Sequence, residues 1–260
     1  MRLSSGNPAV TGPPRQAAFG AALVLSVCLG FAPAAHGVSD ADDVCSSQAA
    51  PCVVSEVISV DNGVTLDFGS RTLAIVSGGR FDLSEATATI RAGRIEASTG
   101  SSAAFKVSGS LAGGGNLTLE ARRICSDDPG ATCLVDGDCA AGTCSAGDGE
   151  VVLNGKVSGS GDSPANILIY AAGDITLSQA INAGGSSADS DGGTVTVESF
   201  AGSVTVEGAM DLGSGGEGTG GDVVLAAAVD LVVGADINAH GGDFGGGTVD
   251  LSAGQDLTVS

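Results

Sequence analysis

Aromatic residues and positive charges are scarce in this sequence. Its 260 residues include no tryptophan and one tyrosine, and 10 lysine and arginine residues stand against 30 aspartate and glutamate residues. Proteins that bind nucleic acid contact phosphates through basic surfaces, so the composition predicts no nucleic-acid partner, and it also disfavours binding to anionic membranes. Proline occurs only 7 times, which excludes collagen and a proline-rich linker.

Glycine and aliphatic residues are abundant instead. There are 43 glycines, more than twice the usual share of roughly 7%. Hydrophobic residues make up 43% of the chain, and the mean hydropathy is +0.31. A chain this apolar can bury enough surface to fold, which excludes intrinsic disorder. Its length allows one large domain or two small ones.

The first 37 residues have the pattern of an export signal. Arg2 and Arg15 precede an uncharged apolar stretch at 17–31, and small residues stand at the −3 and −1 positions of a predicted cleavage site before Val38. The apolar stretch is shorter than the roughly 18 residues of a membrane span, which disfavours the alternative of a membrane anchor. We therefore predict a secreted or cell-surface, extracytoplasmic protein with no transmembrane segment in the mature chain.

Six cysteines remain after cleavage, in two groups. An even number of cysteines in an exported protein indicates disulfides. The sequence predicts a Cys45–Cys52 bridge and two bridges inside 125–144, whose pairing the spacing leaves open. Zinc is a poor alternative, because no two of these cysteines are separated by only two residues and the mature chain has one histidine. The six residues are Cys45, Cys52, Cys125, Cys133, Cys139 and Cys144.

A repeated unit of about 27 residues occupies the C-terminal part of the chain. Three sets of apolar anchors recur in step, with spacings of 26 to 29 residues within each set. Each unit contains three short runs that alternate between apolar and polar residues, a period of two that is typical of β-strands. The anchors are Ile175, Val204, Leu231 and Leu257 in the first set, Ile181, Met210 and Ile237 in the second, and Val195, Val223 and Val249 in the third.

These units predict an all-β fold, a right-handed three-sided parallel β-helix. A propeller blade needs roughly 40–45 residues and four strands, whereas three strands in about 27 residues suit one turn of a β-helix. Equivalent strands of successive turns would stack at about 4.8 Å, and their inward aliphatic side chains would form a continuous core. Asn182, Asp211 and Asn238 fall in one column, either as a hydrogen-bonded ladder or as independent turn residues.

Composition divides the chain into five segments. Apolar content falls and cysteines cluster in the fourth, which predicts a disulfide-stapled insertion with no core of its own. A fourth copy of the repeat begins at Gly254 and stops after seven residues, so we expect the sequence to be truncated at 260. The segments are a signal peptide at 1–37, an N-terminal cap with Cys45 and Cys52 at 38–55, irregular β-helix turns at 56–121, the insertion at 122–149 and regular repeats at 150–260.

Residues for acid–base or nucleophilic catalysis are few. A Ser-His-Asp or Cys-His site needs an imidazole, and the one mature histidine, His240, lies in a glycine-rich corner. Arg91 and Arg94 are interpreted as solvated outward residues. Asp230 and Asp256 should stack one turn apart, at a spacing close to that of a retaining glycosidase, but their place at strand starts favours turn chemistry. We predict no catalytic residue, no organic cofactor and no enzymatic activity.

Calcium is the favoured candidate ligand. Like-charged carboxylates one turn apart repel each other unless water or a cation lies between them, and Ca²⁺ accepts 6–8 oxygen ligands. The glycine-rich loops between the second and third anchors carry several acidic residues. The candidate ligands are Asp189, Asp191, Glu217, Asp222 and Asp243.

The segments GDITLSQAINAGG at 173–185 and GGTVTVES at 192–199 resemble repeats of filamentous-haemagglutinin-like and autotransporter-passenger-like bacterial surface proteins. The resemblance covers 56–121 and 150–260, and it implies a right-handed β-helix exported to the cell exterior, where many such proteins serve adhesion. We therefore expect an adhesin-like structural protein, an acidic stalk that presents loops to an extracellular protein or glycan surface. The alternative is a carbohydrate-active enzyme of the same fold, a polysaccharide lyase or hydrolase.

Overall fold

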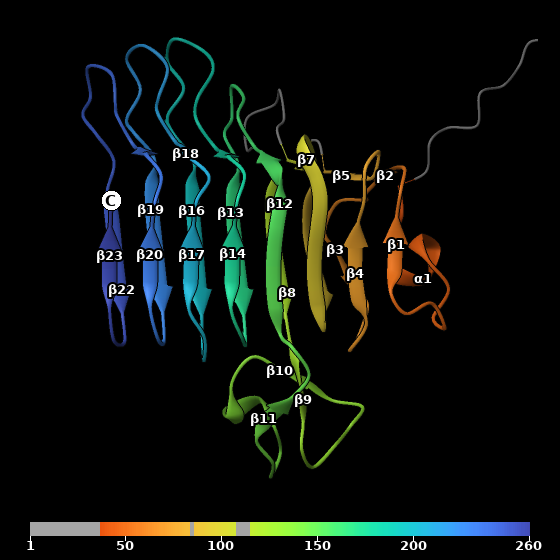
Figure 1. Cartoon of the computed structure of the whole chain (residues 1–260). Coiled ribbons are helices and arrows are strands. Elements are labelled where there is room, and N and C mark those ends of the chain that lie inside the picture. The colour runs from red at the N-terminus through yellow and green to blue at the C-terminus, as the bar shows by residue number, and fades with distance from the viewer. Residues whose placement is uncertain (1–36, 84–85, 108–114) are drawn as a thin grey trace, which may run out of the picture. The chain divides into compact units, whose positions relative to one another are not determined.

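The computed structural model describes residues 37–83, 86–107 and 115–260. The predicted signal peptide, apart from Gly37, lies outside the described residues. Nearly all regular secondary structure of the described chain is β-strand, and the exceptions are one four-residue helix, α1 (Ala41–Val44), and one 3₁₀ turn, η1 (Asp136–Asp138) (Figure 1). Among these residues no helix combines the length and the apolar character needed to cross a membrane.

Parallel strand pairs form three ladders that run through the repeats. Two of the ladders belong to one 13-stranded sheet, because the long strands β7 and β12 take part in both. The first ladder contains β1 (Cys52–Val54), β4 (Thr72–Ile75), β7 (Arg94–Lys106), β12 (Glu150–Ser158), β14 (Ile175–Leu177), β17 (Val204–Val206), β20 (Leu231–Val233) and β23 (Leu257–Val259). The second adds β2 (Val57–Ser59), β5 (Arg80–Asp82), β15 (Ile181–Asn182), β18 (Met210–Asp211) and β21 (Ile237–Asn238).

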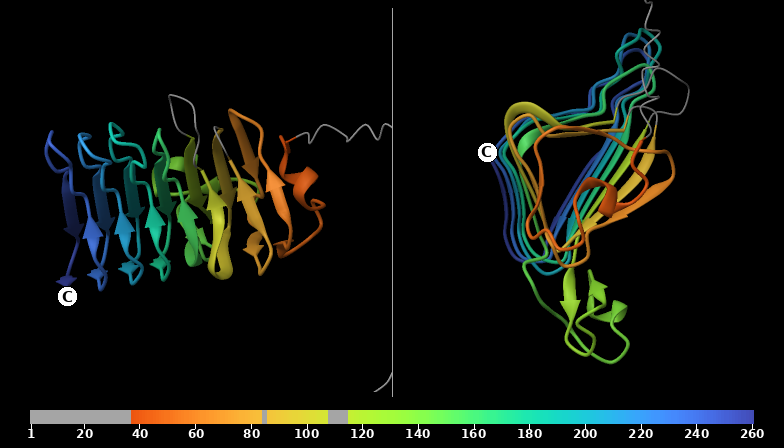
Figure 2. Two further views of the ribbon diagram at one scale, coloured as in Figure 1. Left: turned by 90° about the horizontal axis from the view of Figure 1, so that it is seen from above. Right: turned by 90° about the vertical axis from the view of Figure 1, so that its right-hand side faces the viewer.

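The third ladder is a separate seven-stranded parallel sheet. It consists of β3 (Val64–Asp67), β6 (Thr87–Ala92), β8 (Asn116–Ala121), β13 (Asn166–Ala171), β16 (Thr194–Ser199), β19 (Asp222–Ala227) and β22 (Val249–Ala253). Viewed along the direction of stacking, the traces of successive C-terminal units nearly superimpose (Figure 2).

The predicted register of the three anchor sets is confirmed. Ile175 pairs with Val204, Val204 with Leu231 and Leu231 with Leu257. The second set, from Ile181 to Ile237, and the third, from Val195 to Val249, pair in the same way. Each repeat therefore places equivalent side chains directly beside those of its neighbours.

The core consists of files of aliphatic side chains between the ladders. In β16, Val195 and Val197 are fully buried while the alternating Thr194 and Thr196 are partly exposed, as the period of two predicts. Because each buried residue meets its equivalent in the next unit, one continuous apolar cluster runs from Ala41 to Val233. Burial of this apolar surface, at about 25 cal/mol per Å², is the main term that stabilises the stack.

Aromatic residues fill part of the core in the less regular N-terminal part of the stack. Phe81 pairs with Phe105, and their stacked rings have centroids 5.8 Å apart. Phe105 pairs with Val157, which in turn pairs with Ile181. The second anchor file therefore extends toward the N-terminus through Phe105 and Phe81 to Ile58, which pairs with Phe81. The irregular spacing of the sequence conceals this extension.

Close contact between backbones explains part of the glycine content. Gly193, Gly221 and Gly247 occupy the same position before the third-ladder strands, and a Cβ on Gly221 or Gly247 would lie 2.1 or 1.9 Å from the carbonyl oxygen of the glycine one unit earlier. Real Cβ atoms do not approach that closely, so these two positions require glycine, whereas the equivalent position before β13 is Ala165.

The N-terminal cap covers the first turns. Asp40 caps helix α1 by accepting a hydrogen bond from the Asp42 backbone N–H at 2.9 Å, and Ala41 is buried against the core. A disulfide joins Cys45 to Cys52 at the start of β1. Arg71 donates to the Ser46 carbonyl at 2.8 Å, which connects the cap to the second turn.

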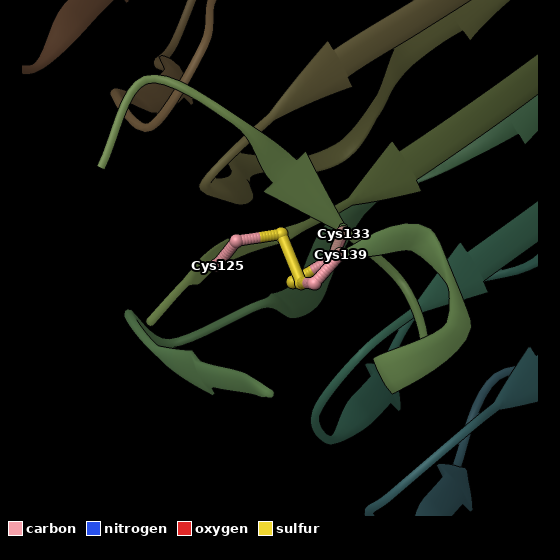
Figure 3. Close-up of side chains that lie close together, drawn as sticks. All are labelled: Cys125, Cys133 and Cys139. Atoms are coloured by element: carbon pink, nitrogen blue, oxygen red, sulfur yellow. A yellow bond between two sulfur atoms is a disulfide. The ribbon is translucent and has the colours of Figure 1, made fainter. Parts of the chain in front are cut away.

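The cysteine-rich insertion projects from the stack between β8 and β12 (Figures 1 and 2). It holds a small antiparallel sheet of β9 (Arg123–Cys125), β10 (Thr132–Cys133) and β11 (Cys144–Ala146). Disulfides join Cys125 to Cys139 and Cys133 to Cys144. The side chains of Cys125, Cys133 and Cys139 lie close together (Figure 3). Two crossed bridges take the place of an apolar core in this segment.

Candidate functional site

A cavity at the base of the insertion is lined by charged, aromatic and aliphatic side chains. Strands β8, β13 and β16 are parallel and in register, so their carboxyl ends meet at one edge of the sheet. The residues that follow these ends, together with η1 and its flanking loops, surround a cavity of about 250 Å³. Its lining consists of Arg123, Leu134, Val135, Asp136, Cys144, Ala172, Phe200 and Ala201.

Arg123 is distinctive among the basic residues. In the part of the chain that the structure describes, Arg123 and Lys156 are the two basic side chains that form no ion pair, and the Arg123 Nε is buried with no hydrogen-bond partner. A Cβ on Gly149 would lie 2.8 Å from the Arg123 Cγ, and one on Gly173 would lie 3.3 Å from its Nη2. The side chain therefore occupies space that two glycines leave open at the cavity wall.

A charged and aromatic column borders the cavity. Arg91, Glu120, Tyr170 and Glu198 occupy one register position on four successive strands of the third ladder. Glu120 accepts hydrogen bonds from the Nε atoms of Arg91 and Arg122, both at 2.8 Å, so two cations compensate its charge.

Tyr170 stands between the two carboxylates of this column. Burial raises the pKa of its phenol above the ordinary value, and the negative charges of Glu198 and Glu120 raise it further. The Phe200 ring centroid lies 6.1 Å from that of Tyr170 at a tilt of 30°, so an aromatic pair connects the column to the cavity. Tyr170 therefore keeps its proton at neutral pH and can donate a hydrogen bond.

A second cavity, of about 130 Å³, lies on the other side of the insertion's base and contains compensated charges. Arg94 in its wall pairs with Glu150 and lies 3.7 Å from carboxylate oxygens of Asp148 and Glu96. Arg91 and Arg94, expected to be simply solvated, are thus bound in ion pairs and are 34% and 26% exposed. These pairs tie the insertion's base to the stack and leave no cation available to a ligand in this cavity.

The five candidate calcium ligands are all exposed; four lie in the C-terminal loops, and Asp222 is the first residue of β19. Asp191 accepts hydrogen bonds from the backbone N–H and hydroxyl of Thr219, both at 2.8 Å, and these bonds lower the pKa of its carboxyl. Asp222 binds Thr248 in the same way, at 3.0 and 2.7 Å. Two of the carboxylates thus join neighbouring units directly.

Within the described ranges, one group of three side chains brings potential metal-ligating atoms together. It consists of Cys125, Cys133 and Cys139, whose sulfur atoms lie within 4.8 Å of one another and are all engaged in disulfides. None of the five candidate calcium ligands belongs to such a group. Calcium binding by these loops remains a prediction from the sequence.

Asp230 and Asp256 act as turn residues. Asp230 accepts a hydrogen bond from the Asp256 backbone N–H at 3.3 Å, and Asp174 accepts one from Ser203 at 2.8 Å in the same column. The carboxylates of Asp174 and Asp230 therefore fix one unit to the next.

The column of Asn182, Asp211 and Asn238 is a partial ladder. The Asn238 amide donates to the Asp211 carboxylate at 3.0 Å, and the same carboxylate oxygen accepts from the Gly213 N–H at 3.2 Å. The exposed His240 ring bonds to the Asn238 side chain through Nδ1 at 2.8 Å. His240 therefore contributes to a corner and has no nucleophile beside it among these partners.

Sequence reasoning did not single out Arg123. Six of the seven other basic residues after residue 37 are ion-paired, and nothing in the sequence spacing distinguishes Arg123 from them. The signals that could have identified it are the doubled arginine directly after a β-strand and the two aromatic residues Tyr170 and Phe200 at equivalent strand ends.

No family model, curated protein or solved structure matches the chain.

Proposed function

We propose that this protein is an exported, adhesin-like surface protein, built as a right-handed three-sided parallel β-helix that serves as an acidic stalk. Its role is to present corner loops and the cysteine-rich insertion to an extracellular protein or glycan surface. The observation that supports this most is the register of Ile175, Val204 and Leu231, which makes the repeats a continuous apolar stack with few exposed irregular features.

Charge and disulfides support the same proposal. The mature chain carries 8 basic and 30 acidic residues, and such a surface repels other copies and stays dispersed at high local density. Three disulfides hold the cap and the insertion, which fits an oxidising compartment outside the cytosol. The insertion occurs once and departs from the repeat, so it is the part of the stalk that can carry specificity.

Binding of the purified, disulfide-bonded protein to defined surfaces tests this function. Beads coated with the protein are presented to arrays of extracellular-matrix proteins and of neutral and acidic glycans, with beads carrying the reduced and alkylated protein as a control. We expect saturable binding to one surface that is lost after reduction. Equal binding by the reduced protein, or binding to none of the surfaces, would refute the proposed role.

A carbohydrate-active enzyme is the second candidate, because Tyr170, Phe200 and Glu198 form an aromatic and acidic surface on which a sugar could stack. The protein is incubated with acidic polysaccharides with and without Ca²⁺, and new reducing ends and unsaturated products are measured. Turnover that is lost in Glu198→Gln would establish the enzyme and displace the stalk as the primary function.

A further inference from the structure

We propose that the cavity at the base of the insertion binds the C-terminal carboxylate of a partner polypeptide whose last residue is aliphatic. This inference deepens the proposed function, on which it rests for the kind of partner. The carboxylate would pair with Arg123, and the aliphatic side chain would fill the cavity against Leu134, Val135 and Phe200.

Among the described residues, no carboxylate forms an ion pair with the Arg123 guanidinium. A guanidinium that has lost water from one nitrogen without gaining a hydrogen bond there is destabilised, and a carboxylate on its remaining nitrogens offsets that loss. Arg80 shows the contrast, because its Nε is also buried and unbonded but its Nη2 lies 3.5 Å from Asp82. Arg123 lacks such a carboxylate, which leaves its charge available to a ligand.

The shape and lining of the cavity select the rest of the ligand. A volume of about 250 Å³ is below the roughly 300–1,000 Å³ of a drug-sized site, so it holds one small unit. Most of the lining side chains are apolar, and only Arg123 and Asp136 carry polar groups. A sugar would leave several hydroxyls without side-chain partners, whereas an aliphatic residue needs apolar contact, one cation and an acceptor for its amide N–H.

The walls of the cavity are held in place before any ligand arrives. The disulfide from Cys144 to Cys133 and the hydrogen bond from the Cys144 N–H to Asp136 at 2.7 Å fix the insertion side. Strand ends of the main stack fix the opposite side, where Ala172 is buried and Phe200 packs near Tyr170. A preformed site loses little conformational entropy on binding, which raises affinity for a small group.

Small-molecule probes test the inference directly. N-acetyl-L-leucine carries the carboxylate and the aliphatic side chain, N-acetyl-L-leucinamide lacks the charge, and glucuronate carries a carboxylate on a sugar. Each is titrated into the ¹⁵N-labelled, disulfide-bonded protein, and the Arg123 Nε–Hε signal is followed by NMR. We expect N-acetyl-L-leucine to shift this signal and the amide to bind about tenfold or more weakly, because it forms no charged pair.

Two variants and a matched control complete the test. Arg123→Gln removes the charge, and Ala201→Phe fills the cavity without changing charge; both should weaken N-acetyl-L-leucine binding by about tenfold or more. Lys156→Gln removes the other unpaired mature cation, outside the cavity lining, and should bind like the wild type.

Each contrary outcome has a distinct meaning. Equal binding of the acid and the amide, tighter binding of glucuronate, or the absence of any shift would overturn the inference. The proposed function is judged separately: if Arg123→Gln beads adhere to the same surface as the wild type, the cavity is not the contact site although the stalk function stands.

Discussion

At the scale of single residues, Ser199 shows how one side chain secures a corner. It is 3% exposed, its hydroxyl donates to the Gly173 carbonyl at 2.7 Å, and it accepts from the Gly202 N–H at 2.9 Å. Its equivalents in the neighbouring units are Ala171 and Ala227. The serine therefore serves the local backbone, because the same position elsewhere needs only a small apolar residue.

Ser199→Ala should destabilise the protein even though alanine occupies the equivalent positions. The substitution leaves a buried carbonyl and a buried N–H without their partner, at a cost of about 1–3 kcal/mol. Urea unfolding monitored by circular dichroism measures the change. Ser252→Ala, in the exposed part of β22, is the control and should change the free energy of unfolding by less than about 0.5 kcal/mol.

Tyr170 makes the electrostatics of its column measurable, because it is the one tyrosine of the chain. Phenolate absorbance during an alkaline titration should give a pKa above the ordinary 10.0, chiefly because the phenol is partly buried. Glu198→Gln removes one neighbouring negative charge and should lower that pKa. Glu217→Gln, an exposed loop residue, should leave it unchanged, and a Tyr170 pKa that Glu198→Gln does not lower would contradict the assigned cause.

The sign of the accompanying stability change follows from linkage. Folding raises the pKa of Tyr170, so the folded protein holds the phenol proton more tightly than the unfolded chain. The resulting contribution to stability is complete below tyrosine's ordinary pKa of 10.0 and is lost as the pH rises through the raised value. Glu198→Gln should reduce this alkaline loss of stability.

At the scale of the strand, the sequence predicted which side chains point into the core and which point toward solvent. The period of two placed Val204 inward and Thr205 outward, and the structure gives 0% exposure for Val204 and partial exposure for Thr205. The equivalent of Thr205 in the next unit is Val232, so the outer position tolerates either residue. The inner position is aliphatic in all four units of this file.

Exchanging the two residue types tests this facing. Val204→Thr keeps the shape but buries a hydroxyl without a partner, which should cost about 1–3 kcal/mol. Because repeats contact mainly their neighbours, the loss of amide protection should concentrate in β14, β17 and β20. Thr205→Val is the matched control and should change stability by less than about 0.5 kcal/mol. Hydrogen exchange with mass spectrometry measures amide protection in both variants. Equal loss of protection in the two would refute the assignment of Val204 to the core and Thr205 to the outer face.

The same element-scale reasoning could not predict the site. The period of the repeat identifies equivalent positions in successive units. It predicts no structure where a segment departs from the repeat, as at Arg123 and in the insertion. The pairing of Cys125 with Cys139 depends on how the small sheet folds, and six cysteines in two groups leave that choice open. Phe200 contributes to the cavity because the strand ends of β8, β13 and β16 coincide with the insertion's base, which only the three-dimensional arrangement brings together.

At the scale of the whole described stack, charge is distributed unevenly. The 8 lysine and arginine residues of 38–260 all lie from Arg71 to Lys156, whereas 157–260 contains 14 acidic residues and no lysine or arginine. The N-terminal turns therefore hold attractive ion pairs such as Arg91–Glu120, while the C-terminal repeats hold only mutually repelling carboxylates. Salt weakens both the attraction within the ion pairs and the repulsion between the carboxylates, because the Debye length falls from about 30 Å at 0.01 M to about 3 Å at 1 M.

Salt should consequently have opposite effects on the two halves. Raising NaCl from about 20 mM to about 500 mM should increase amide protection in β16–β23, where screening removes repulsion. Protection beside the Arg94 and Glu120 ion pairs should stay constant or fall, because screening weakens attraction there. Asp250→Asn removes one exposed carboxylate of β22 and should reduce the salt response of the C-terminal strands. A uniform gain across both halves would show that salt acts by strengthening apolar burial throughout, and not through this asymmetry of charge.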